Sequence, residues 1–440
     1  MSATPAAAAT RFAEPLGSGL DPCGQADPCS IQNAADPTKV QDGDEVVLLP
    51  GDYSLSATLG IVDAIDIHGQ AGQPRPRLLS SASTALHTDG DGFLVRDLEI
   101  VHSGTGAALL DGALGTVERV FVHTTAGSSA CAPIGPLAAT VIRDSVCWNS
   151  GTGAGVGGDP VGAGVRGGTL RNVTAVASGS GPDAAGILPK GNGSVQFTLD
   201  AKNVIARGTT ADVKGNPDAT SSAVVTLDHS NYATEASGTT GTTMITNPGT
   251  GTNQTASPAF ANAGAGNFHQ LAGSPTIDAG ATVDLLGSTD LDGEPRSQGS
   301  APDIGADEFA EANPGLGSLE LSVEAKGKQK AKRLKAELGC GAQACEVSIG
   351  GKGKVPKRLA ATTAKSKRFK LKPRLVAVAA GETETVRLKF KRHKKAVKKI
   401  GKLISRGGKR AGKRSKVKAT FVATGAGGAD AAKLKIKLKG

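Results

Sequence analysis

Aromatic residues are scarce in this 440-residue sequence. Phe, Tyr and Trp together make up 3 % of it, and Trp148 is the only tryptophan. Proteins that bind sugars or nucleic acid bases by stacking need aromatic rings that lie against the ligand. The composition therefore excludes a binding surface built on an aromatic platform.

Long apolar segments are lacking too. No run reaches the roughly 18 residues that identify a membrane-spanning helix, and Met1 to Thr10 has neither the charged start nor the apolar centre of a signal peptide. The Ala-rich run Ala6 to Ala9 is still compatible with the end of a signal peptide. We interpret residues 1–10 as its remnant and expect an exported or cell-surface protein.

Cysteine is infrequent, and zinc-binding spacings are missing. The six cysteines fall as three close pairs, which are Cys23/Cys29, Cys131/Cys147 and Cys340/Cys345. No pair has the CxxC spacing and no His/Cys cluster accompanies them, which argues against a zinc site. Local pairing of an even set predicts disulfides and an oxidising compartment. Reduced, buried thiols are the alternative.

Charge is divided unevenly along the chain. Residues 1–310 hold 14 Lys+Arg and 32 Asp+Glu, a net charge of −18, whereas the rest carries +28. We predict an acidic domain over residues 11–310, a linker over 311–318 and a basic domain over 319–440.

The acidic part contains a repeated pattern. Short apolar runs separated by turn residues predict strands, and their steady recurrence from Val46 to Val225 argues against disorder. In each repeat a polar residue precedes apolar residues at the first and third following positions. The polar residues, spaced by 22 to 31, are Asp97, Arg119, Asp144, Asn172, Asn203 and His229. The expected inward-facing pairs are Leu98/Ile100, Val120/Val122, Val173/Ala175 and Val204/Ala206.

This pattern predicts an all-β solenoid with one coil per repeat. Asp and Asn suit the polar column because they tolerate the left-handed backbone of a tight corner, although Arg119 does not fit that reasoning. A second column, Arg166, Lys190 and Lys214, has equal spacings of 24 and is predicted to stack on successive coils. A β-sandwich is the alternative fold.

Asp42 to Tyr53, the repeats, and Ser274 to Glu308 together resemble pectate-lyase-like right-handed parallel β-helix proteins. The last of these stretches resembles the choice-of-anchor Q type found in exported bacterial proteins. The resemblance implies a right-handed parallel β-helix over residues 11–310. It leaves the activity open, because lyases, hydrolases and binding proteins share this fold.

Lyases of this superfamily take a sugar proton with an Arg or Lys while calcium or another cation neutralises the uronate. The resemblance implies four catalytic candidates, which are Arg166, Lys190, Lys214 and Asp212. It implies two ligand-binding candidates, which are Asp111 and Asp183. The alternative is that the cations extend from a solvated face. A glycoside hydrolase needs two carboxylates, and the many acidic residues single out no pair.

Calcium is the only cofactor that the sequence suggests. Asp290 and Asp292 have the first spacing of a calcium loop and Asp303 follows, but the remainder of an EF-hand pattern is missing. The alternative is a closing structural segment in which Arg296 pairs with an acidic neighbour such as Asp303.

The basic part alternates apolar residues with Lys and Arg, which predicts a small β-sandwich-like domain with one helix around residues 396–404 and a Cys340/Cys345 hairpin. Its charge could bind nucleic acid, an acidic cell-wall polymer or the acidic domain, or could keep strand edges from pairing. Without interleaved aromatics or a reader motif, nucleic acid is disfavoured. The domain resembles those at the ends of exported actinobacterial proteins.

Together these observations predict an exported or cell-surface monomer that binds acidic polysaccharide or a cell-wall polyanion. The alternative is a polysaccharide lyase or glycoside hydrolase that acts on an acidic polysaccharide.

Overall fold

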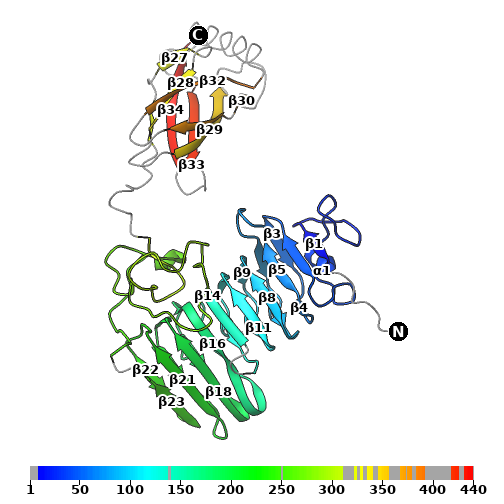
Figure 1. The fold of residues 1–440 in the computed structure, drawn as a ribbon, viewed down its shortest axis with the longest axis vertical. Coiled ribbons are helices and arrows are strands. Elements are labelled where there is room, and N and C mark those ends of the chain that lie inside the picture. Colours follow the sequence, from blue (N-terminus) through cyan, green and yellow to red (C-terminus); the bar gives the residue numbers. More distant parts are fainter. Residues whose placement is uncertain are drawn as a thin grey trace. The chain divides into compact units, whose positions relative to one another are not determined.

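The computed structural model divides the chain into two compact units, Met1–Ala310 and Glu311–Gly440 (Figure 1). In the first unit it describes residues 8–136, 140–248 and 251–310. In the second it describes residues 322–324, 328–330, 334–339, 345–355, 367–372, 374–378, 383–391, 418–425 and 431–439. Within these ranges no helix has the length and apolarity needed to span a membrane.

Parallel strands wind around three faces of the first unit. The strands of the first face, given with their bounds, are β1 (Thr10–Ala13), β2 (Glu45–Leu48), β5 (Asp66–Gly69), β8 (Phe93–Arg96), β11 (Gly115–Glu118), β18 (Asn192–Lys202), β21 (Ser222–Asp228) and β23 (Thr242–Thr246). Those of the second face are β3 (Asp52–Leu55), β6 (Arg77–Ser80), β9 (Glu99–His102), β12 (Phe121–Thr124) and β19 (Ile205–Gly208). Two long strands, β14 (Thr140–Asn149) and β16 (Val161–Ala177), run through both faces and join them into one 15-stranded sheet.

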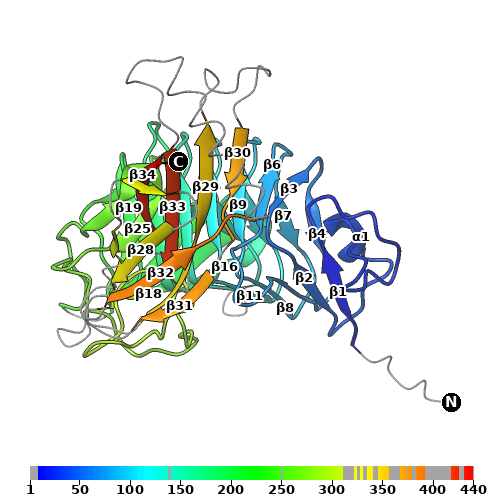
Figure 2. The ribbon, with the colours of Figure 1, turned by 90° about the horizontal axis from the view of Figure 1, so that it is seen from above.

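The third face is an eight-stranded sheet. Its strands are β4 (Leu59–Ile61), β7 (Leu86–Thr88), β10 (Leu109–Asp111), β13 (Cys131–Pro133), β15 (Val156–Gly158), β17 (Ala185–Pro189), β20 (Ala211–Gly215) and β22 (Glu235–Ser237). Figure 2 shows successive strands of the first unit side by side, from the blue N-terminal end to the green end. The predicted right-handed parallel β-helix is confirmed.

The polar column forms the corner between the first and second faces. All six of its residues have positive φ, between 44° and 57°. The prediction of a left-handed corner is therefore confirmed at every position. Arg119 adopts this backbone although Arg rarely does, and its guanidinium lies 2.8 Å from Asp97 and 2.7 Å from Glu118. These two ion pairs offset part of the backbone cost.

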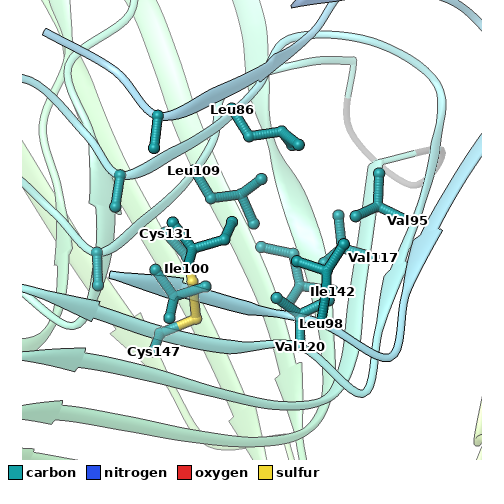
Figure 3. Packing of buried hydrophobic residues seen from close by; sticks show 14 of the residues in the cluster. Leu86, Val95, Leu98, Ile100, Leu109, Val117, Val120, Cys131, Ile142 and Cys147 are labelled. Carbon is teal, nitrogen blue, oxygen red and sulfur yellow. A yellow bond between two sulfur atoms is a disulfide. The ribbon is translucent and has the colours of Figure 1, made fainter. Parts of the chain in front are cut away.

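The predicted inward-facing pairs fill the interior. All eight of their side chains are fully buried. Figure 3 shows Leu98, Ile100 and Val120 packed in this core with Leu109 from the third face. Burial of alternate residues on all three faces is what holds the short strands together.

Two of the predicted disulfides are confirmed, Cys23–Cys29 and Cys131–Cys147. The first lies near the N-terminal end beside the short helix α1 (Ile31–Ala34). The second crosses the core from β13 to β14, as Figure 3 shows. Cys340 lies outside the described residues, so the third pair stays a prediction.

Replacing Cys131 and Cys147 together by Ala is expected to lower the free energy of unfolding by about 3 kcal/mol, because the bond closes a short loop in the unfolded chain. Urea unfolding followed by circular dichroism measures this. Ser56→Ala, a substitution at an exposed position, serves as the control. A loss of less than about 1 kcal/mol would contradict the prediction.

A closing segment follows the last coil. It contains β24 (Phe260–Asn262), the 3-10 turn η1 (Ala263–Ala265) and β25 (Asn267–Gln270), and then irregular backbone up to residue 310. The segment packs on the corner column, since Asn203 bonds to Ala281 and Asn172 bonds to the carbonyl oxygen of Asp303. Long-range side-chain bonds therefore replace regular strands here.

The described residues of the second unit form two small sheets. One contains β26 (Ser322–Glu324), β28 (Leu334–Gly339) and β32 (Thr383–Leu388). The other contains β27 (Lys328–Lys330), β34 (Ala431–Lys439), β33 (Lys418–Gly425), β29 (Cys345–Val355), β30 (Lys367–Lys370) and β31 (Arg374–Val378). The predicted β-rich character of this part of the chain agrees with these strands, and the sandwich-like arrangement stays a prediction. The predicted linker and the helix around residues 396–404 lie outside the described residues.

Candidate functional site

Two of the candidate cations meet at one carboxylate on the third face. Lys190 follows β17, Lys214 lies on β20, and Asp183 precedes β17. The Nζ atom of Lys190 lies 2.7 Å from Oδ2 of Asp183, and that of Lys214 lies 3.9 Å from Oδ1. Lys214 also donates to the carbonyl oxygen of Pro182 at 2.6 Å. We call these three side chains the Lys190–Asp183–Lys214 cluster.

Strand alternation places the cluster on the outside of the coil. β17 and β20 are parallel neighbours, with Ile187 opposite Val213, and both of these side chains are fully buried in the core. Lys214, the next residue, therefore points outward. The cluster side chains of Lys190, Asp183 and Lys214 are 28 %, 26 % and 14 % exposed. The site is thus partly open to solvent and carries one excess positive charge.

Arg166 does not belong to this cluster, and the predicted stacking of Arg166, Lys190 and Lys214 is wrong. Arg166 lies on β16 opposite Phe197 of β18, in the other sheet. Within the described part it has no hydrogen bond or ion pair. Because β16 is 17 residues long, equal spacing in the sequence does not correspond to one full coil. Lys190 also lies beyond the end of β17, whereas Lys214 lies within its strand.

Asp212 is a structural acceptor. Its carboxylate lies 2.9 Å from Arg207 and accepts backbone hydrogen bonds from Gly208 and Ala233 at 3.0 and 2.7 Å. The residue is only 5 % exposed. With its oxygens bonded to protein groups, Asp212 is poorly placed to act as a base on a substrate.

The structure does not bring Asp111 to Asp183. Asp111 lies on β10 two residues after Leu109, so both side chains point into the core, and Asp111 is fully buried. Thr88 donates to Oδ1 of Asp111 at 3.0 Å, and Oδ2 has no hydrogen-bond partner among the residues that the structure describes. Burial raises the pKa of Asp111 to about 7. This carboxyl belongs to the core and has no surface to offer a ligand.

The three calcium candidates do not fit a shared ion. Asp290 accepts backbone hydrogen bonds from Asp292, Glu294 and Glu308, which uses both of its oxygens. Asp303 accepts backbone hydrogen bonds with Oδ1 and Oδ2, the latter from Phe309. Asp290 and Asp303 thus stabilise the closing segment, and calcium has no support from this trio.

Arg296 does pair with acidic residues, but Asp303 is not the ion-pair partner. The guanidinium of Arg296 lies 2.8 Å from the carboxylate of Asp144 and 3.7 Å from that of Glu308. Asp144 is a corner residue on β14. Sequence proximity suggested Asp303, whereas the fold brings a distant coil against Arg296.

A cleft of about 750 Å³ lies between the loop after β5 and the closing segment. Its charged lining residues are Arg75, Asp97, Glu99 and Asp292. The sequence analysis did not identify this site. A signal was present, because the loop Gln70–Pro76 replaces the single corner residue of later coils and contains one Gly and two Pro.

A group of three titratable side chains lies next to this cleft, and the repeat pattern gave no reason to expect these residues together. The ligand atoms of His269, Asp292 and Asp307 all lie within 4.8 Å of one another. Burial raises the pKa of Asp307 to about 6. Burial also favours the protonated form of Asp292, but the hydrogen bond from His269 and the charge of Arg75 outweigh it and lower the pKa.

The fold defines the class of this chain as a right-handed parallel β-helix protein with a small β-rich second unit. No protein-family model and no curated protein matches the sequence. Among solved structures, the crystal structure of pectate lyase Pel9A is similar, with 14 % identity and a TM-score of 0.39. The match covers 69 % of this chain and 97 % of that one.

Proposed function

We propose that this is an exported or cell-surface β-helix protein that binds acidic polysaccharide or a cell-wall polyanion. The observation that carries the proposal is the Lys190–Asp183–Lys214 cluster, where two ammonium groups share one carboxylate on a partly exposed face. The excess positive charge favours an anion. Lys214, 3.9 Å from Asp183, has the looser ion pair, whereas Lys190 is the more exposed cation, at 28 % against 14 %.

The same contacts favour binding over proton abstraction. A lysine that acts as a base must present an unprotonated nitrogen to the substrate. Here Nζ of Lys190 already donates to Asp183 at 2.7 Å. Arg166 lies in the other sheet, so it does not complete a catalytic arrangement with this cluster.

Export and attachment belong to the proposal. Disulfides form in oxidising compartments, so Cys23–Cys29 and Cys131–Cys147 support export. The net charge of +28 beyond residue 310 supports contact with a polyanion. The likeness of residues 274–308 to the choice-of-anchor Q type remains a prediction.

Replacing both Lys190 and Lys214 by Ala is expected to weaken binding of tetragalacturonate by about tenfold or more, because it removes both cations and leaves Asp183. Isothermal titration calorimetry of the full chain measures this. Lys202 lies on β18 and pairs with Asp284 of the closing segment. Lys202→Ala is the control and should change the affinity less than threefold. Equal losses in both variants would contradict the proposed site.

A lyase is tested with the same ligand. Lyase products are unsaturated uronates that absorb in the ultraviolet, and the proposal expects a flat absorbance trace with and without calcium. A rising trace that disappears in Arg166→Ala would replace the proposal with the lyase alternative.

The hydrolase alternative has one observation in its favour. Asp292 and Asp307 lie in one group beside the cleft, and their pKa values are displaced in opposite directions. Glycosidases use such a pair as proton donor and carboxylate. Release of reducing ends that is lost in Asp292→Asn would favour this alternative over binding.

A further inference from the structure

The register between two strand segments of the second unit brings cations together. Leu371 forms an isolated antiparallel bridge with Phe390. The backbone nitrogen of Lys372 donates to the carbonyl oxygen of Lys389 at 2.8 Å. Lys372 and Lys389 therefore lie opposite each other, one position beyond the bridge.

Beyond this point the two segments separate. β31 pairs with β29, where Arg374 lies opposite Ile349. β32 pairs with β28 in the other sheet. The separation leaves a hollow of about 460 Å³, whose lining residues are Lys372, Arg374, Arg387 and Lys389.

Alternation directs these four side chains to the same side. Leu371, Val386, Leu388 and Phe390 are buried, and the four cationic residues between or beside them are exposed. Glu384 alternates in phase with the buried residues Val386 and Leu388. Its Cα–Cβ bond therefore points to the side of β32 opposite the four cations. Among the described residues that line the hollow, none is a carboxylate.

Folding alone gives no reason for this arrangement. Like charges directly opposite each other on neighbouring strands are destabilising. None of the four cations forms an ion pair within the described part. An anion in the hollow would relieve the repulsion, and two guanidinium groups can each donate a pair of hydrogen bonds to it.

We infer that this hollow is an oligoanion site that binds a stretch of an acidic polysaccharide. The inference deepens the proposed function and rests on it for the class of ligand. Adjacent cations on one strand are separated by two residues, or roughly 7 Å, which suits a linear polymer with repeated charges. None of the described lining residues is aromatic, so base stacking does not support a nucleic acid as ligand.

The test measures binding of fluorescent polygalacturonate by the full chain across a range of salt concentrations. Arg374→Gln with Arg387→Gln is expected to weaken binding about tenfold and to reduce the salt dependence, because two charge contacts are lost. Lys370→Gln with Lys391→Gln is the matched control. It removes the same charge from the same two segments, on the other side of the Leu371–Phe390 bridge, and should have less than a threefold effect.

Equal weakening by both double variants would show diffuse attraction and overturn the inference. Tighter binding of single-stranded DNA, with the same dependence on Arg374 and Arg387, would replace the polysaccharide by nucleic acid. Lys190→Ala with Lys214→Ala separates the two sites. If it has no effect while Arg374→Gln with Arg387→Gln does, the β-helix proposal fails and the hollow remains. Circular dichroism confirms that each variant is folded.

Discussion

Replacing Arg296 by Met is expected to lower the free energy of unfolding of the β-helix unit by about 3–5 kcal/mol, because a buried charge loses its partner. Asp144 and Arg296 are 0 % and 2 % exposed and lie 2.8 Å apart. Arg296 also donates to the carbonyl oxygens of Gly305 and Ala306. The substitution therefore removes the ion pair between the closing segment and the corner column and leaves the hydrogen bonds of Asn172 and Asn203 in place.

Urea unfolding at pH 8 measures this effect. Arg77→Ala is the control because the ion pairs of Arg77 with Asp52 and Glu99 are open to solvent, with side chains 42 %, 54 % and 29 % exposed. Their loss should cost under about 1 kcal/mol. Adding Asp144→Asn to Arg296→Met should restore part of the stability, since the unpaired charge is then gone. If Arg296→Met costs no more than Arg77→Ala, the closing segment does not depend on this pair.

Asp111→Asn is expected to change the pH dependence of stability. Burial raises the pKa of Asp111 from 3.8 to about 7, so between these pH values the folded protein keeps a proton that the unfolded chain loses. This contribution is fully present below about pH 4 and is lost as the pH rises through 7. Relative to the parent, Asp111→Asn should gain up to about 4 kcal/mol between pH 4 and pH 8.

Unfolding free energies at several pH values measure the slope. Asp218→Asn is the control with the opposite sign, because hydrogen bonds from Gly193, Ser221 and Thr220 lower the pKa of Asp218 to about 2. That variant should lose stability relative to the parent as the pH rises from 2 to 4. A difference between Asp111→Asn and the parent that does not vary with pH would show that Asp111 is not protonated in the folded state.

Features that depend on neighbouring residues could be read from the sequence. The corner column was correct from Asp97 to His229, because a single left-handed residue and the alternation after it are decided within a few positions. Cys23–Cys29 and Cys131–Cys147 followed from proximity in the chain for the same reason.

Contacts between coils could not be read in this way. Lys190 and Lys214 meet at Asp183, whereas Arg166, equally spaced from Lys190, lies in the other sheet. Composition also gave no indication that Asp111 faces the core. Equal spacing in the sequence does not predict which side chains meet on neighbouring coils, because coil and strand lengths vary along the chain.

Alternation and backbone preference act locally, so the β-helix, its corner residues, its inward-facing pairs and the charge of each unit could be predicted from the residues alone. The folded structure was needed to see that Arg296 pairs with Asp144, that a cleft lies between the loop after β5 and the closing segment, and that four cations line one hollow. These contacts depend on strand register, which is fixed by all the loops in between and by the packing of segments far apart in the chain.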